Sequence, residues 1–359
     1  MAGGFSHTER RTINKLILDE DQQASGIARP QCEHGPAMRF RRVTKDVDGH
    51  VVSSRDFYAC SAIRDRKICP LFVWVDEHEK RHAGDHHSIK RPRRGDEPGR
   101  EYKKTDNKAN AQYFFSEEAV GVIREYTAKH DYHRVLCLGT PVIHQRLQGD
   151  LDSFLLDMDP VVVKKAADSG ARFNMINGFF FDSEGRERFD GWLAKGPVDV
   201  VVVDPPFQPE LIPAIWKCVR EVLIGSDAFA NVDVVFAFPY FSREALMGSK
   251  ESPELVMNDY RVDYANHKTY KADKSPVRLF TRFHELTDLP TESYRVCEKC
   301  DGRWVHKANA HCDKCGACTT IHGNKPWSHC LACKKCTKPE LKHCSECQRC
   351  LPVGHTCRS

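Results

Sequence analysis

The residues best suited to chemistry form the short sequence Asp204-Pro205-Pro206-Phe207, which directly follows the largely apolar run Val198–Val203. The Asp204 carboxylate and the Pro205 carbonyl can together accept hydrogen bonds from both protons of an exocyclic amine, which leaves the nitrogen lone pair free to attack an electrophilic methyl group. The two prolines carry no amide donor and stiffen the loop, and Phe207 can stack on a base. This sequence is therefore predicted to bind an amine at the end of a strand.

The same four residues resemble the D/N-P-P-F/Y/W signature of amino-methyltransferases that use S-adenosylmethionine. The resemblance implies catalysis by positioning and electrostatics, with the amine proton lost to solvent after transfer. It places the cofactor next to Asp204 and beside the sequence Leu138-Gly139-Thr140-Pro141. That sequence departs from the usual G-x-G-x-x-G pattern, so Gly139 is a weak signal by itself.

Further cofactor contacts are expected from side chains near neighbouring strand ends. The ribose hydroxyls need a carboxylate at the end of the second strand, and Asp157 or Asp159 fits this position. Asn177, at the end of the third strand, can reach an adenine edge. Gln112 and Tyr113 lie where related enzymes close a segment over the cofactor, although both residues also suit the lead into a helix.

Apolar segments alternate with helical patterns between the two ends of the chain. Strands are predicted over residues 134–139, 153–159, 173–178, 198–203 and 231–240, and helices over residues 116–126 and 211–224. Near-continuous apolar strands separated by helices indicate a parallel sheet that is covered on both faces. The predicted fold class is therefore α/β, with a doubly wound, Rossmann-like methyltransferase domain flanked by two small zinc-stapled domains.

A zinc site is predicted near the N-terminus, from ligands on two hairpin-like segments: Cys32, His34, Cys60 and Cys69. A module this small needs such a staple in order to fold. The surrounding sequence resembles the GRF-type zinc finger, a module that binds single-stranded nucleic acid, although Asp56 departs from the usual sequence motif of that finger. Its aromatic residues are candidates for base stacking or for the core of the module: Tyr58, Phe72 and Trp74.

The C-terminal segment repeats the pattern H-C-x-x-C-x-x-C three times, with C-x-x-C before the repeats and H-x-C after them. The predicted ligands are Cys297, Cys300, His311, Cys312, Cys315, Cys318, His329, Cys330, Cys333, Cys336, His343, Cys344, Cys347, Cys350, His355 and Cys357, which suffice for four tetrahedral sites. Neighbouring zinc ions are expected to share the ligands of one copy in a ladder, and the spacing leaves their pairing open. Such closed sites are structural. His306 and His322 fall outside the repeat and are expected at the surface.

This ladder resembles the cysteine-rich domain of DHHC palmitoyltransferases, including the sequence Trp327-Ser328-His329-Cys330. That activity needs transmembrane helices, and the longest apolar runs here fall far short of the roughly 20 residues of a membrane span. Only the zinc scaffold is therefore expected to carry over, and palmitoyl transfer is excluded.

Cysteine usage and charge favour a nucleic-acid partner in a reducing compartment. The start of the chain has no apolar core of signal-peptide length, so the 17 cysteines are expected to be reduced. Cys137 and Cys218 lie in apolar surroundings and are expected to be buried and inert. Residues 297–359 carry eleven Lys/Arg against five Asp/Glu, and residues 80–110 carry ten against five. Two basic patches around a globular middle suit a polyanion.

The predicted organisation has five parts: an N-terminal tail (1–28) with a short helix over residues 11–21, a GRF-type finger (29–79), a basic linker (80–106), a methyltransferase domain (107–290) and a multi-zinc domain (291–359). In this order, the parts resemble the CCHC-zinc-finger family of large-subunit ribosomal RNA adenine-N6 methyltransferases. The second, C2H2-type finger of that family and its terminal CCHC knuckle are not recognised here.

The family resemblance implies N6-methylation of an adenosine in structured, 28S-type ribosomal RNA. It also implies a location in the nucleus, nucleolus or cytoplasm. The ligand count predicts about one N-terminal and four C-terminal zinc ions, the short apolar runs predict no membrane partner, and no obligate protein partner is evident. The segment Met257–Pro276 corresponds to a loop that can occlude the active site.

Two other functions remain open at this stage. The Asp-Pro-Pro-Phe sequence also occurs in DNA adenine and protein-glutamine methyltransferases, although two basic zinc modules favour a nucleic acid over a peptide. A non-catalytic RNA-binding scaffold is the second alternative. The intact Asp204 loop argues against a scaffold, and the atypical loop at Gly139 argues mildly for it.

Overall fold

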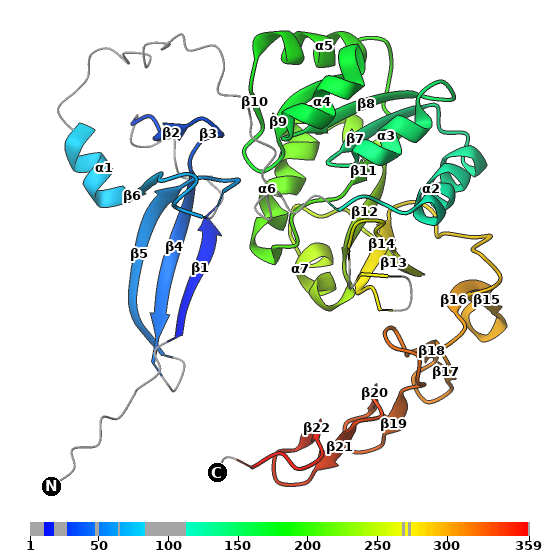
Figure 1. Ribbon diagram of the computed structural model, residues 1–359. Coiled ribbons are helices and arrows are strands. Elements are labelled where there is room, and N and C mark those ends of the chain that lie inside the picture. Colours follow the sequence, from blue (N-terminus) through cyan, green and yellow to red (C-terminus); the bar gives the residue numbers. More distant parts are fainter. Residues whose placement is uncertain are drawn as a thin grey trace, which may run out of the picture.

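The computed structural model describes residues 11–17, 27–46, 50–63, 65–82, 113–267, 270–271 and 274–357. In chain order it consists of an N-terminal β-rich module, a central α/β domain and a row of small hairpins that extends away from that domain (Figure 1). Gln112 and nearly all of the predicted basic linker lie outside the described residues.

A four-stranded antiparallel sheet in the order β1-β4-β5-β6 forms the centre of the N-terminal module. The elements of the module are β1 (Arg11–Ile17), β2 (Gln31–Cys32), β3 (Gly35–Pro36), β4 (Met38–Lys45), β5 (Val51–Ala59), β6 (Phe72–Trp74) and α1 (Val75–His82). The helix predicted over residues 11–21 is wrong, because residues 11–17 pair with β4 along their whole length. Pairing with the exposed edge of β4 overrides the weak helical preference of this segment.

The central domain contains an eight-stranded sheet in the order β10-β9-β8-β7-β11-β12-β14-β13. Its strands are β7 (Arg134–Leu138), β8 (Asp152–Asp157), β9 (Gly170–Asn174), β10 (Phe179–Phe180), β11 (Val200–Val203), β12 (Asp233–Pro239), β13 (Val256–Arg261) and β14 (Val277–Thr281). Strands β9, β8, β7, β11 and β12 run parallel, and β10, β14 and β13 are antiparallel additions. The predicted α/β class with a parallel central sheet is confirmed.

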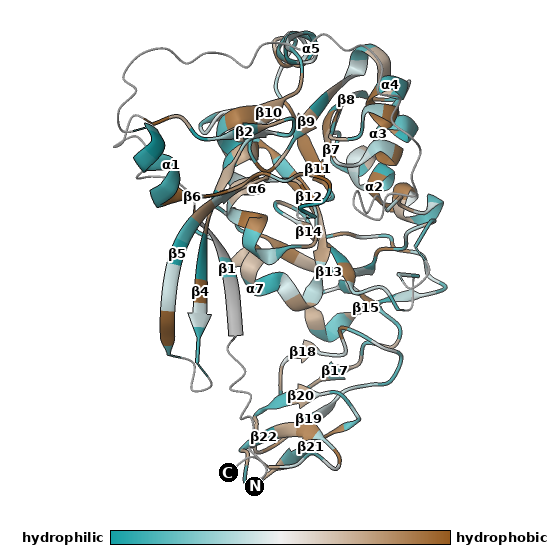
Figure 2. Cartoon of the chain, turned by 60° about the vertical axis from the view of Figure 1, so that its left-hand side comes forward, coloured by the Kyte–Doolittle hydropathy of each residue, from teal (hydrophilic) through white to brown (hydrophobic). Residues whose placement is uncertain are grey.

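Helices cover both faces of this sheet. They are α2 (Glu117–Lys129), α3 (Pro141–Leu147), α4 (Pro160–Ala166), α5 (Ser183–Leu193), α6 (Ile212–Lys217) and α7 (Arg243–Met247), and α6 continues as a π-helical turn over Cys218–Ile224. Helix α2 begins after Ser116 as predicted, because the Ser116 hydroxyl accepts a hydrogen bond from the Ala119 amide. Side chains of α2 and α3 pack on one face and those of α5 and α6 on the other. Figure 2 shows the resulting apolar centre of the sheet.

Short two-stranded hairpins follow one another along the C-terminal segment (Figure 1). They pair β15 (Tyr294–Cys297) with β16 (Arg303–His306), β17 (His311–Cys312) with β18 (Ala317–Cys318), β19 (Ser328–Cys330) with β20 (Lys335–Thr337), and β21 (Leu341–Cys344) with β22 (Arg349–Pro352). Few of the side chains beyond β16 are buried, so these hairpins need metal staples rather than a core. Among the described helices, none is long and apolar enough to cross a membrane.

Candidate active site and zinc centres

A cleft of about 380 Å³ lies at the carboxyl ends of the parallel strands and gathers most of the predicted site residues. It is lined by Ala62, Tyr113, Phe114, Gly139, Pro141, Asp157, Met158, Asp159, Met175, Asp204, Pro205, Pro206, Phe207, Gln208 and Tyr270. Leu138 and Thr140 flank Gly139 but are completely buried, and the Thr140 hydroxyl donates to the Val202 carbonyl at 3.4 Å. These two residues therefore support the loop from behind.

Glycine at position 139 is required by the approach of the two loops that form the floor of the cleft. Gly139 has a φ of +70°, and a Cβ there would lie 2.8 Å from the Asp204 carbonyl oxygen and 2.9 Å from the Met175 methyl group. The Asp204 amide donates to the Leu138 carbonyl at 3.1 Å. A glycine at this position therefore allows the first strand's loop and the Asp204 loop to pack against each other.

Two carboxylates lie at the end of β8, as predicted. Asp157 is buried and one of its carboxylate oxygens accepts the Asp159 amide at 2.8 Å. Asp159 caps α4 by accepting the Val161 amide at 2.7 Å. Both side chains line the cleft, so either can meet a pair of hydroxyl groups there.

The catalytic candidate Asp204 has a partner that the sequence did not reveal. The Tyr264 hydroxyl, which is completely buried, donates to Asp204 Oδ1 at 3.1 Å. Burial raises the pKa of Asp204, the hydrogen bond from Tyr264 lowers it, and the charge of Asp157 raises it again. Tyr264 lies 60 residues downstream of Asp204. Its position in the segment expected to occlude the active site was the sole indication in the sequence that it lies near Asp204.

Aromatic side chains surround the carboxylate and form a site for a planar ring. The Phe207 ring lies 5.9 Å from that of Phe238 and 6.5 Å from that of Tyr270. Tyr113 lies 5.7 Å from Tyr264 and contacts the same cluster. Of these rings, Phe207, Tyr270 and Tyr113 line the cleft and can contact a purine, whereas Phe238 is completely buried.

We expect the hydrogen bond from Tyr264 to set the lower pH limit of activity. Only ionised Asp204 offers all of its lone pairs to an amine, so kcat/KM should fall as the pH drops through the pKa of Asp204. Tyr264→Phe removes the interaction that lowers this pKa, so the acidic limb should move to higher pH, and the free energy of unfolding should fall by about 1 kcal/mol. Asp204→Asn does not titrate and should lack this limb. A limb that stays in place in Tyr264→Phe would contradict the assignment.

The N-terminal finger packs against the central domain and completes the cleft. The Asn174 side chain donates to the His34 carbonyl at 2.9 Å and to the Ser61 hydroxyl at 2.8 Å. Asn177 donates to the carbonyls of His34 and Pro36 at 3.1 and 2.9 Å. The structure therefore does not bring Asn177 to the cleft as predicted, because the finger uses its amide. Instead, Ala62 of the finger lines the cleft.

We expect Gly35→Ala to separate the finger from the sheet. Gly35 has a φ of +95°, and a Cβ there would lie 2.5 Å from the Phe179 ring. Gly149 has a φ of +91° but faces open space, so Gly149→Ala is the matched control for backbone strain alone. The control should lose about 1 kcal/mol of unfolding free energy and Gly35→Ala about 2–4 kcal/mol, with weaker S-adenosylmethionine binding. Equal losses in urea unfolding would show that the contact with Phe179 is unimportant.

The finger's aromatic residues divide between core and surface. Tyr58 is buried against Ala37 and Val75, whereas Phe72 and Trp74 are only partly buried. The Arg42 guanidinium lies over both of these rings at 5.5 and 5.3 Å. Phe72 and Trp74 are thus partly accessible rings flanked by arginines, and they remain the candidates for base stacking.

The cysteine and histidine ligands gather into five groups of four that match the predicted set. They are Cys32, His34, Cys60 and Cys69; Cys297, Cys300, His311 and Cys318; Cys312, Cys315, His329 and Cys336; Cys330, Cys333, His343 and Cys350; and Cys344, Cys347, His355 and Cys357. The ligand atoms of each group lie within 4.8 Å of one another. Three thiolates and one imidazole at this spacing fit a closed tetrahedral zinc site.

The ladder arrangement of the C-terminal sites is now defined. Each of the middle sites takes two cysteines from one copy of the repeat and a histidine with the last cysteine from the next copy. In three successive sites the histidine Nδ1 lies 3.2 Å from the thiol of the second cysteine. The ligands of one copy are therefore divided between neighbouring sites, as expected.

Residues 106–272, which contain most of the central sheet and the Asp204 loop, match the family model described as "Probable N6-adenine methyltransferase". The human protein named "rRNA N(6)-adenosine-methyltransferase ZCCHC4" is 32% identical over 385 residues, covering 83% of this chain and 73% of the relative. The chain belongs to the ZCCHC4 family. The ZCCHC4 protein of Xenopus tropicalis is 30% identical over 79% of this chain and 73% of its own length.

Membership of the ZCCHC4 family confirms the predicted family and enzyme class. Relatives of this family are named as rRNA N6-adenosine methyltransferases. A solved structure of a putative methyltransferase from Escherichia coli aligns with 46% of this chain and 86% of its own length at 15% identity. Its TM-score is 0.29, too low to bear on the fold.

Proposed function

We propose that this chain transfers the methyl group of S-adenosylmethionine to the N6 amine of an adenosine in large-subunit ribosomal RNA. The observation that carries this proposal is the cleft in which Asp204-Pro205-Pro206-Phe207 meets Gly139 and the carboxylates after β8. An amine acceptor site and a cofactor site thus share one enclosure, in a chain that belongs to the ZCCHC4 family.

The residues present fit S-adenosylmethionine, which supplies an electrophilic sulfonium methyl group when it is bound. Gly139 lines the cleft, and the absence of a Cβ there lets the Asp204 loop and Met175 pack closely against the end of β7. Asp157 or Asp159 can accept hydrogen bonds from two ribose hydroxyls. Tyr113 lines the cleft where the predicted closing segment meets it.

The acceptor half of the cleft can hold and orient an adenine. Phe207 and Tyr270 offer ring faces, while the Asp204 carboxylate and the Pro205 carbonyl accept the two protons of the amine. Removing the amine from water and directing both N–H groups to acceptors aims the lone pair away from them. An adenine must leave its stack to enter, which costs a few kcal/mol and favours a bulged or loop base.

The parts outside the cleft suit a structured RNA. Phe72 and Trp74 of the finger lie beside arginines, and the C-terminal segment is basic. Phosphate neutralisation supplies much of the affinity for RNA without reading its sequence. We therefore propose the large ribosomal subunit as the source of this RNA. The family resemblance is our reason for proposing the nucleus or nucleolus, and also the cytoplasm, as locations. The five ligand groups are our reason for proposing about five zinc ions.

The direct test measures methyl transfer from labelled S-adenosylmethionine to purified large-subunit ribosomal RNA, followed by nucleoside analysis. N6-methyladenosine that disappears in Asp204→Ala would support the proposal. Cofactor binding without ribosomal RNA methylation would redirect the search to other nucleic acids or proteins. If the wild-type protein binds no S-adenosylmethionine at all, a zinc-containing scaffold would be favoured.

A further inference from the structure

Two completely buried arginines, Arg261 and Arg278, lie directly opposite each other on β13 and β14. Two guanidinium groups side by side in a core are unfavourable unless each is supplied with hydrogen-bond acceptors. The two strands end beside the active site, because the segment 262–276 that connects them carries Tyr264. The groups that accept hydrogen bonds from these arginines therefore help to determine the position of the segment 262–276.

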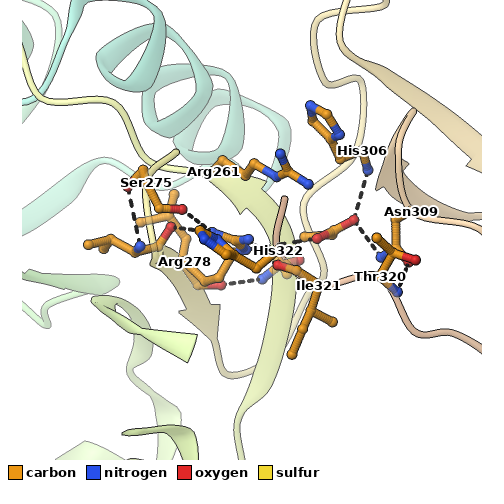
Figure 3. A network of polar contacts seen from close by, with 12 residues as sticks. Arg261, Ser275, Arg278, His306, Asn309, Thr320, Ile321 and His322 are labelled. Carbon is orange, nitrogen blue, oxygen red and sulfur yellow. Dashed lines mark hydrogen bonds and ion pairs between the residues drawn. The ribbon is translucent and has the colours of Figure 1, made fainter. Parts of the chain in front are cut away.

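Part of this compensation comes from the C-terminal zinc domain, while the Asp259 carboxylate on β13 lies 3.8 Å from Arg278 Nε. Residues 319–327, which we call the strap, connect a ligand of the first C-terminal zinc site to a ligand of the second. Arg278 donates from Nη2 to the Ile321 carbonyl, as Figure 3 shows. Arg261 donates from Nη2 to the Gly323 carbonyl at 2.9 Å. Hydrogen bonds to backbone carbonyls of the strap thus offset part of the free-energy cost of burying both charges.

The strap is itself held in place by a chain of polar contacts. Asp259 on β13 accepts hydrogen bonds from the His306 amide and the Asn309 side chain, both at 2.8 Å. Asn309 in turn accepts the Thr320 amide at 2.6 Å (Figure 3). Asp259, Asn309 and Thr320 are all buried. The position of the strap is therefore fixed from β13.

The prediction that His306 and His322 lie at the surface is wrong. His306 is buried where β16 packs against β13. His322 is half-buried, and its ring stacks on Tyr240 at 5.3 Å. Both residues belong to the contact between the zinc domain and the central sheet, a tertiary contact that the repeat spacing could not reveal.

Arg278 also contacts the end of the active-site segment. Its Nη1 donates to the Ser275 carbonyl at 2.9 Å, and Ser275 is completely buried. One guanidinium therefore joins the strap to the last residues of the segment 262–276. Within that segment, Tyr264 donates to Asp204 and Tyr270 lines the cleft.

We propose that Arg278 is a positioning residue for methyl transfer, which ties the strap to the segment 262–276 and so holds Tyr264 and Tyr270 at the active site. The inference rests on the proposed function. It makes activity depend on the first two C-terminal zinc sites, because Cys318 and His329 fix the two ends of the strap. The last site, which includes Cys347, lies further along the ladder and should not affect the segment.

The main experiment compares Arg278→Lys with Arg282→Lys in the full chain. A lysine keeps the charge but cannot offer the planar fork that contacts two carbonyls in different directions. Arg282 is the matched control, since it is only partly buried and donates to the Phe229 and Val232 carbonyls, not to the strap or the segment. Hydrogen–deuterium exchange of peptides from 262–276 should become at least about tenfold faster in Arg278→Lys and stay unchanged in the control.

Kinetics provide the second readout. In Arg278→Lys, kcat should fall about tenfold or more with little change in KM for RNA, because the groups around the reacting amine are misplaced while the RNA contacts remain. If this variant fails to fold, Asn309→Ala loosens the strap without altering either arginine and should change exchange in the same direction.

The metal dependence is tested with two cysteine variants that each disrupt one zinc site. Cys315→Ser, in the second C-terminal site, should lower zinc content and accelerate exchange at 262–276. Cys347→Ser should lower zinc content and leave exchange at that segment unchanged.

Unchanged exchange at 262–276 in folded Arg278→Lys or Asn309→Ala would overturn the proposal, whatever the activity. Equal acceleration in Arg282→Lys would also overturn it, by reducing Arg278 to a general stabilising residue. Exchange is measured without RNA, so a wild-type protein that methylates no RNA would contradict the proposed function alone.

Discussion

Asp204→Ala is expected to reduce methyl transfer by about a thousandfold or more, because it removes the acceptor that orients the amine in the transition state. RNA binding should remain nearly unchanged, since the basic residues of the finger and of the C-terminal segment lie outside the cleft. The two effects are separated by measuring single-turnover methylation and RNA affinity on the same preparation.

The control for this variant is Asp204→Asn, which keeps one oxygen acceptor at the same position. It should retain measurable activity, in keeping with the asparagine that the related signature allows. The backbone amide of Asp204 donates a hydrogen bond to the Leu138 carbonyl. Because this hydrogen bond does not involve the side chain, neither substitution should disturb the loop. Full activity of Asp204→Ala would show that the amine is held by other groups.

Cys330→Ser is expected to unfold part of the C-terminal ladder. Cys330 belongs to the third C-terminal site, with Cys333, His343 and Cys350. The hairpins there have few buried side chains, and structural zinc contributes about 10–16 kcal/mol of apparent binding free energy in comparable small modules. Losing one thiolate should therefore release the metal and disorder the hairpins that it joins.

Zinc content and thermal melting measure this outcome. Cys137→Ser serves as the matched control, because Cys137 is completely buried in the central core and belongs to none of the metal groups among the described residues. The control should lose stability in the central domain but keep its zinc. Unchanged zinc content with normal melting in Cys330→Ser would contradict the ladder.

Local patterns predicted the chemistry well where function depends on residues close in sequence. Asp204 and its neighbours form a contiguous loop after a buried strand, and the zinc ligands keep short, regular spacings that leave few ways to close a tetrahedron. The ends of the parallel strands also predicted the position of Asp157, because such ends meet at one edge of the sheet.

The parts that sequence reasoning missed depend on contacts between distant segments. Tyr264 reaches Asp204 only because an antiparallel hairpin was added beyond β12. Asn177 lies near the expected strand end, yet the finger uses its amide. Burial of Arg278 depends on a strap more than 40 residues away. No local periodicity specifies which neighbouring element will take a given side chain.

The presence of Ala62 in the wall of the cleft bears on how such enzymes can diversify. A finger that only recruited RNA could be exchanged for another binding module by recombination at the linker. Here the finger closes part of the catalytic enclosure, and the amides of Asn174 and Asn177 hold it there. Replacing the finger by another module would therefore also remove part of the cleft wall, so we expect nucleic-acid preference to change more readily by substitution on the finger's outer face than by module exchange.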